Sequence, residues 1–226
     1  MRIVTVAEMT LRELLRRRAV IALLLLLPLA FYLIRRDEYV GQSVRSLFLG
    51  IGWAVSTAAL FSSIGARPIE PRLRLAGYRT IDLVLGRLCG LWTLGGLLAA
   101  PFLLLVRVDV PNLRYGAVAL AMLCCVAVAA PFGMLIGEVL PRELEGTLFL
   151  LTAVALQMII DPATSIAKAT PFWSSREIGT YAVDLTGGEY LARGSVHGLT
   201  VTLLMVGLVC ATAALRLRRR SYLRQA

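Results

Sequence analysis

The side chains best equipped for binding chemistry lie in one basic segment, residues 65–82, between two apolar runs. Pro68 and Pro71 prevent a continuous helix through it, because proline donates no backbone hydrogen bond. The pattern predicts one short helical turn at residues 72–75 that ends at Gly77. We expect basic and tyrosyl groups to face outward and apolar ones to face the membrane. The candidate contact residues are Glu70, Arg72, Leu73, Arg74, Leu75, Tyr78, Arg79 and Asp82.

Two kinds of contact suit this segment. It can rest on anionic lipid head groups, or it can hold a soluble partner at the membrane surface. Thr80 is predicted to be the N-cap of the apolar helix that follows. Asp82 then lies in the first turn of that helix, where a carboxylate meets the positive end of the helix dipole.

Few other residues offer chemistry. His197 is the single histidine, and the four cysteines have no metal-ligand spacing, so we expect the cysteines to pack and we expect no metal or cofactor in this chain. The sequence also lacks a P-loop and a Gly-x-Ser-x-Gly motif, so we expect no enzyme activity of its own. Polar groups within the apolar runs either line a pathway or bond one helix to another: Ser56, Thr57, Thr152 and Gln157.

The elements that must hold these residues are apolar. The chain has 226 residues, 58% of them hydrophobic, and a mean hydropathy of +0.76. These values indicate an integral membrane protein. The net charge is +10, but the arginines flank apolar runs instead of forming one stripe. Anchoring at membrane surfaces therefore explains the charge better than nucleic-acid binding.

We predict an all-α membrane protein with a single domain of six transmembrane helices. The apolar runs are residues 19–34, 46–64, 83–106, 115–140, 147–160 and 194–215. The first and fifth are short for a membrane span, which needs about 20 residues. Basic residues concentrate in the segments that share a side with the N-terminus, so both termini are expected in the cytoplasm and the protein in the cytoplasmic membrane. No charged residue lies in the middle of a run, which argues against an ion-coupled transporter.

Two further segments are predicted to be amphipathic. Residues 1–18 suit an interfacial helix, although they could also simply extend the first span into the cytosol. Residues 161–193 suit an outer helical hairpin, with a turn at 164–169 and a helix at 175–185. Ser174 and Glu177 match a capping box that would start this helix. The hairpin could lie flat on the outer leaflet or cover a pathway between subunits.

Several stretches, taken in order, resemble the permease subunits of type-2 ABC transporters over essentially the whole chain. Ile-Asp-Leu-Val-Leu-Gly-Arg-Leu at 81–88 is similar to the family's coupling segment. Residues 131–137 and 145–151 are similar to its junction between spans four and five. Pro-Phe-Trp at 171–173 resembles its outer hairpin, and the arginine-rich tail at 216–220 is typical.

The resemblance implies a complex of two such permease subunits, identical or similar, with two P-loop ATPase subunits that bind ATP and Mg. It implies ATP-driven export across the cytoplasmic membrane, and the lack of charge at depth favours an apolar or amphipathic cargo such as a drug, lipid, lipid-linked glycan or hydrophobic peptide. Residues 65–82 would be the coupling loop. The alternatives are a membrane scaffold or anchor subunit without transport activity and, more weakly, an enzyme that acts on lipid.

Overall fold

A computed structural model describes residues 2–34, 36, 39–140, 142–161 and 164–222. These residues form helices and connecting turns, with no strand among them. The elements are α1 (Arg2–Arg16), α2 (Arg18–Leu33), α3 (Val40–Ala66), α4 (Glu70–Leu75), α5 (Thr80–Asp109), α6 (Tyr115–Val139), α7 (Glu143–Ile159), η1 (Ser165–Ala169), α8 (Trp173–Val183) and α9 (Gly188–Tyr222). The prediction of an all-α chain is confirmed.

Four helices within the described residues are long and apolar enough to cross a membrane. They are the segments Gly41–Ala66, Thr80–Asp109, Tyr115–Val139 and Gly188–Leu217. The chain is therefore a multi-pass α-helical protein by the length and composition of these helices. The helix α2 has 16 residues and α7 has 17, or about 24 Å and about 26 Å at 1.5 Å per residue. Both fall short of a hydrocarbon core of about 30 Å.

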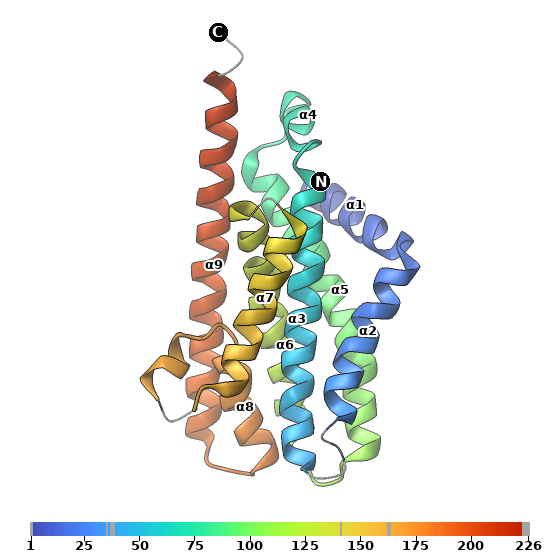
Figure 1. Ribbon diagram of the computed structural model, residues 1–226, viewed down its shortest axis with the longest axis vertical. Helices are drawn as coiled ribbons and strands as arrows, with labels where there is room; N and C mark the ends of the chain where they lie inside the picture. Colours follow the sequence, from blue (N-terminus) through green and yellow to red (C-terminus); the bar gives the residue numbers. More distant parts are fainter. Residues whose placement is uncertain (1, 35, 37–38, 141, 162–163, 223–226) are drawn as a thin grey trace.

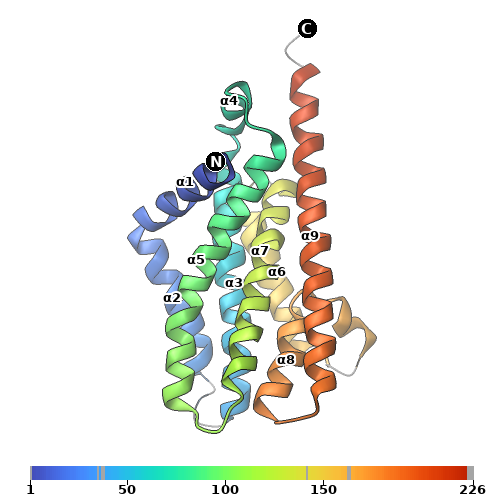
Figure 2. The same ribbon diagram turned by 180° about the vertical axis from the view of Figure 1, so that it is seen from behind.

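The long helices stand side by side, and α3 and α6 form the interior of the bundle (Figures 1 and 2). Of the apolar stretch of α3, 72% is buried, whereas the figure for α9 is 17%. In Figure 1 the helix α2 lies to the right of this pair and α9 to its left. A large part of the surface of α9 is therefore left for lipid or for another protein chain.

The interior packs tightly because small residues let helix backbones approach. A Cβ atom added at Gly133 of α6 would lie 2.0 Å from the carbonyl oxygen of Ser56 in α3, so only glycine fits there. Gly133 forms a Gly-x-x-x-Gly motif with Gly137. Two further motifs of this kind also fall at helix contacts: Gly86 and Gly90 against α1, and Gly194 and Gly198 against α8.

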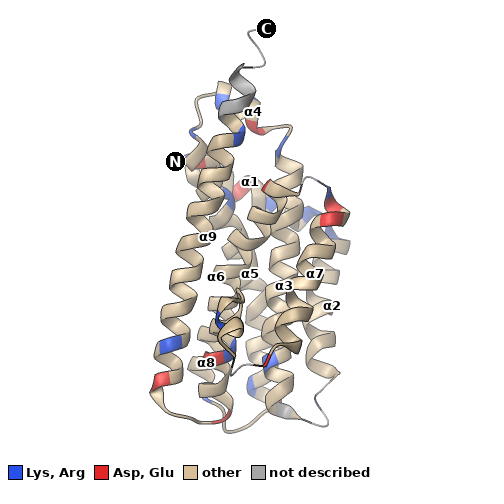
Figure 3. Cartoon of the chain, turned by 60° about the vertical axis from the view of Figure 1, so that its left-hand side comes forward, with Lys and Arg blue, Asp and Glu red and all other residues tan. Residues whose placement is uncertain are grey.

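Charged residues gather at the two ends of the bundle and leave an uncharged band between them (Figure 3). One end, called the α4 end below, carries α1, α4, the start of α5 and the last turns of α9 (Figure 1). The opposite end, called the α8 end, carries η1, α8 and the start of α9. A band without charge, flanked by charge, is the pattern that a bilayer selects.

The helix α1 is separate from α2, and the chain turns between them at Arg17. The helix α1 therefore does not continue straight into α2. The side chains of Val6, Thr10 and Leu14 are buried, while Val4 and Leu15 are exposed. The buried side chains recur every four residues, which places them on one face of the helix.

Three predicted helix starts are wrong by one or two residues. The helix α4 begins at Glu70, two residues before the predicted start at residue 72. The N-cap of α5 is Arg79 instead of Thr80, and the carboxylate of Asp82 accepts a hydrogen bond of 3.0 Å from the Arg79 backbone N–H. The helix α8 begins at Trp173, so Ser174 lies inside it and does not cap it. Instead, Oε1 of Gln157 accepts the N–H of Phe172, at 3.2 Å, just before the helix.

Candidate functional site

The helix α4 is the centre of the candidate site, and its sequence determines both of its ends. Pro71 lies in the first turn, where the missing N–H costs no helical hydrogen bond. The helix stops at Gly77, whose φ of 86° is left-handed and suits glycine. The N–H groups of Tyr78 and Gly77 then bond back to the carbonyls of Leu73 (3.1 Å) and Arg74 (3.0 Å). This pair of bonds is the Schellman arrangement, which closes a helix firmly.

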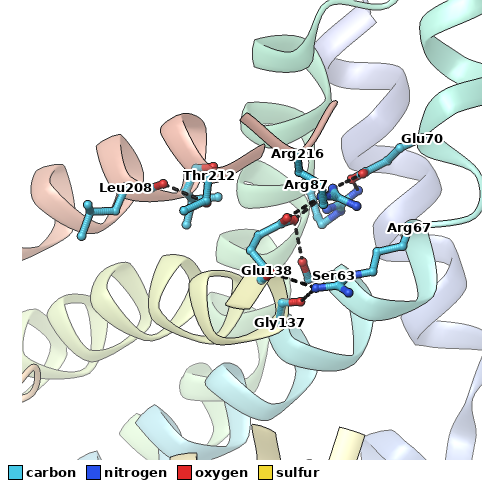
Figure 4. Close-up of polar contacts among 10 residues, drawn as sticks. Ser63, Arg67, Glu70, Arg87, Gly137, Glu138, Leu208, Thr212 and Arg216 are labelled. Atoms are coloured by element: carbon cyan, nitrogen blue, oxygen red, sulfur yellow. Dashed lines mark hydrogen bonds and ion pairs between the residues drawn. The ribbon is translucent and has the colours of Figure 1, made fainter. Parts of the chain in front are cut away.

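A buried ion pair fastens α4 to the bundle. Glu70, the first residue of α4, is 3% exposed, and its Oε1 lies 2.7 Å from Nη2 of Arg87 in α5, which is 4% exposed. The other carboxylate oxygen of Glu70 pairs with Arg216 near the end of α9. Figure 4 shows the three side chains converging from three helices. Glu70 therefore faces inward, away from the surface on which the sequence led us to expect contacts.

The same network reaches α6 and α3. Nε of Arg216 lies 2.8 Å from Oε2 of Glu138, and the Ser63 hydroxyl donates to Oε1 of Glu138 at 3.2 Å. Arg67, at the end of α3, donates to the carbonyls of Gly137 and Glu138, the second at 2.9 Å. We call the side chains of Ser63, Arg67, Glu70, Arg87, Glu138 and Arg216 the buried network (Figure 4).

The buried network alternates charge so that each buried ion has a partner. A buried charge without one is costly, and removing one member of such a pair destabilises a protein by about 3–5 kcal/mol. The network joins α3, α4, α5, α6 and α9 at one point. A displacement of α4 must therefore move these helices with it or break the ion pairs.

The helix α1 supports the other side of this region. Gly86 and Gly90 let it approach α5 closely, because an added Cβ at either would lie 2.8 Å from a carbonyl oxygen of α1. Arg2 donates to the Gly77 carbonyl and places its guanidinium 5.8 Å from the centre of the Tyr78 ring. Tyr78 is thus half-buried beside α1, although we expected it to face outward.

The remaining coupling candidates lie at the surface or near it. Arg72, Arg74, Leu75 and Arg79 are exposed, and Leu75 is 75% exposed. Leu73 and Asp82 are half-buried, and Leu73 lines a cavity of about 540 Å³ with residues of α1 and α5. The coupling candidates therefore present three arginines and one leucine outward from a fixed base.

The four pathway candidates have separate surroundings. Ser56 donates to the Ala129 carbonyl of α6 at 3.1 Å, so it bonds helix to helix. Thr152 is exposed and donates to the carbonyl of Leu148 in its own helix. Gln157 holds the chain before α8, as described above. Of these four candidates, only Thr57 has a buried hydroxyl that lacks a hydrogen-bond partner among the described residues.

Sequence reasoning did not assign the buried network. Its signal was the presence of Arg87 and Glu138 inside predicted apolar runs, because an ion near lipid needs a partner. The sequence does not identify the partners of these ions, since even Glu70 and Arg216 are 146 positions apart in the chain.

The described residues contain no group of three or more histidine, cysteine or acidic side chains placed to hold a metal ion. Comparison of the chain with protein-family models and with curated proteins finds no match. The geometry of the α4 end and the resemblance of the sequence motifs are therefore the grounds for a function.

Proposed function

We propose that this protein is the transmembrane subunit of an ATP-driven exporter and that partner P-loop ATPases bind at its α4 end. The helices α2, α3, α5, α6, α7 and α9 would be the six spans, with α1 at the interface and both termini in the cytoplasm. Two permease subunits, identical or similar, would form the pathway. Two ATPase subunits would bind ATP and Mg.

The observation that carries the proposal is the combination of an exposed basic surface, on α4 and the turn that follows it, with a buried anchor beneath it. Arg72, Arg74 and Arg79 are exposed and available to acidic groups of a partner. Glu70, at the start of α4, is bound to two other helices. A surface that only rests on lipid head groups needs no such anchor, whereas a force-bearing contact does.

The network also supplies a route for movement. ATP binding would draw the two ATPases together and displace α4. Because Glu70 pairs with Arg87 and Arg216, the displacement would reach α5 and α9. Arg67 and Glu138 would carry it to α3 and α6. The helices of the bundle would then part or close at the interface between the two subunits.

The shortness of α2 and α7 is compatible with six spans. Arg18 begins α2 and is exposed, so its side chain can extend to the membrane surface. The helix α7 starts with Glu143 and Glu145, which favour the positive end of the helix. Local thinning of the bilayer accommodates a short span at modest cost.

Affinity purification from native membranes tests the proposal. The tagged chain is extracted in a non-ionic detergent, and the bound chains are identified by mass spectrometry. We expect a P-loop ATPase at one copy per permease chain. Recovery with other membrane proteins but no nucleotide-binding chain would support the scaffold alternative and contradict the proposal.

A pair of matched variants then tests the surface. Reversal of three charges in R72E/R74E/R79E should abolish recovery of the ATPase. The control R12E/R16E/R142E changes the net charge by the same amount, at exposed arginines of the same end. It should recover the ATPase as the wild type does. Recovery of the ATPase by R72E/R74E/R79E at the wild-type level would show that the arginines of residues 72–79 do not form the contact.

A further inference from the structure

The α8 end contains a cavity of about 730 Å³. It lies between the start of α3, the end of α7 and the first turns of α8. Small-molecule sites commonly have volumes of roughly 300–1,000 Å³. Its polar wall consists of Gln42, Arg45, Ser46, Gln157, Ser175 and Arg176. Leu49, Met158 and Ile159 make an apolar wall. The cavity is thus divided into a polar part and an apolar part.

Two guanidinium groups line the polar part. The guanidinium of Arg176 donates a hydrogen bond from Nη1 to the Ile160 carbonyl at 3.3 Å. Its pKa is lowered, first by burial and next by repulsion from Arg45, while Asp161 and Glu177 partly offset this. Nε of Arg45 is buried and has no hydrogen-bond partner among the described residues. Two half-buried like charges are therefore held near one another.

The nearby carboxylates pair with arginines, one of them in the cavity wall and one outside it. Asp184 pairs with Arg45, and Glu177 pairs with Arg193 at 3.2 Å. Neither they nor Asp161 are among the described residues that line the cavity. The described lining residues therefore include two arginines and no acidic side chain, and an anion placed there would add to Asp184 in relieving the repulsion between the arginines.

We propose that this cavity binds the phosphate head group of an amphiphile, with the apolar tail against Leu49, Met158 and Ile159. Guanidinium groups bind phosphate oxygens through paired, charge-assisted hydrogen bonds. The amide of Gln157 uses its oxygen on Phe172, which leaves its NH₂ free to donate. Together the two guanidinium groups, the Gln157 amide and the Ser46 hydroxyl supply hydrogen-bond donors. These donors suit the three terminal oxygens of a phosphate better than the two oxygens of a carboxylate.

The binding site depends only on the geometry of the cavity. Its role as a site for exported cargo rests on the proposed function, because the cavity is at the end of the bundle opposite α4. A head group held there would be at the outer surface, where a transported amphiphile leaves. The two proposals can fail separately, since binding to the purified chain requires no ATPase.

Calorimetric titration of the purified full-length chain in maltoside detergent tests the site. The probes are dihexanoyl phosphatidic acid, dihexanoyl phosphatidylcholine and inorganic phosphate. The variants are R176Q, R45Q and the control R107Q. Arg107 is an exposed arginine of the same end that does not line the cavity. The melting temperature of each variant shows whether it remains folded.

We expect phosphatidic acid to bind wild type and R107Q alike, and R176Q and R45Q about tenfold or more weakly, which corresponds to one charge-assisted hydrogen bond. Phosphatidylcholine, whose phosphate is neutralised within the head group, should bind at least tenfold more weakly than phosphatidic acid. Equal binding of phosphatidic acid by R176Q and R107Q would overturn the site. Inorganic phosphate that binds as tightly as phosphatidic acid would overturn the assignment to an amphiphile.

Discussion

Replacing Glu70 by glutamine should strongly destabilise this protein. In E70Q the shape of the side chain is kept, but Arg87 loses its carboxylate partner while it stays 4% exposed. Arg216 also loses a partner but keeps Glu138 at 2.8 Å. Breaking a buried ion pair costs about 3–5 kcal/mol. Because one of the two arginines keeps a carboxylate, we expect the lower end, about 3 kcal/mol.

The expected change in melting temperature follows from this energy. In a chain of about this length, 1 kcal/mol corresponds to roughly 2–4 °C. E70Q should therefore melt about 6–12 °C below the wild type in differential scanning fluorimetry of the purified protein. The control is E143Q, which neutralises an exposed glutamate at the start of α7. Its melting temperature should change by about 2 °C or less.

A double variant separates loss of charge from loss of shape. In E70L/R87L both members of the buried pair become apolar, which is often neutral or stabilising for such a pair. It should melt above E70Q. If the melting temperature of E70Q equals that of E143Q, the prediction is refuted, because Glu70 would then not be a buried partner of two arginines.

Two further predictions concern glycines. G133A should give little folded protein, because its Cβ would lie 2.0 Å from the Ser56 carbonyl oxygen and would force α3 away from α6. A monodisperse profile like that of the wild type in size-exclusion chromatography would contradict this packing. G77A should fold but melt about 2–8 °C lower, because a left-handed residue other than glycine costs about 1–2 kcal/mol and the added Cβ meets only Arg2, at 3.7 Å. An unchanged melting temperature of G77A would show that α4 does not end in this conformation.

The sequence predicts the helices well, because long apolar runs have few structures open to them. The run 115–140 became α6, Tyr115–Val139, and the turn and helix predicted for residues 164–185 became η1 and α8. The residue at which a helix begins follows less directly from the sequence than the presence of the helix. Thr80 and Ser174 both suit an N-cap, but the contact of Gln157 with Phe172 and the packing of Ser174 decide where α8 begins. Such tertiary contacts override local preference.

The candidate site was predictable in part. A break after α3, a short helix and its end before Gly77 follow from local backbone chemistry, and the structure has all three, although the break covers residues 67–69 and the helix begins at Glu70 instead of residue 72. The burial of Glu70 does not follow from local sequence. An acidic residue in a basic loop usually faces water, and only the approach of Arg87 and Arg216 makes burial favourable here. These partners come from helices whose relative position is set by the whole fold.

The central claim is that α4 contacts an ATPase, and site-specific photo-crosslinking in native membranes tests it most directly. A benzophenone amino acid replaces Leu75, which is 75% exposed on α4, and a control carries it at Leu199, which is 63% exposed on α9. We predict a crosslink from position 75, and none from position 199, to a chain with a P-loop. Crosslinks from position 75 to lipid alone, or only to proteins that bind no nucleotide, would contradict the account.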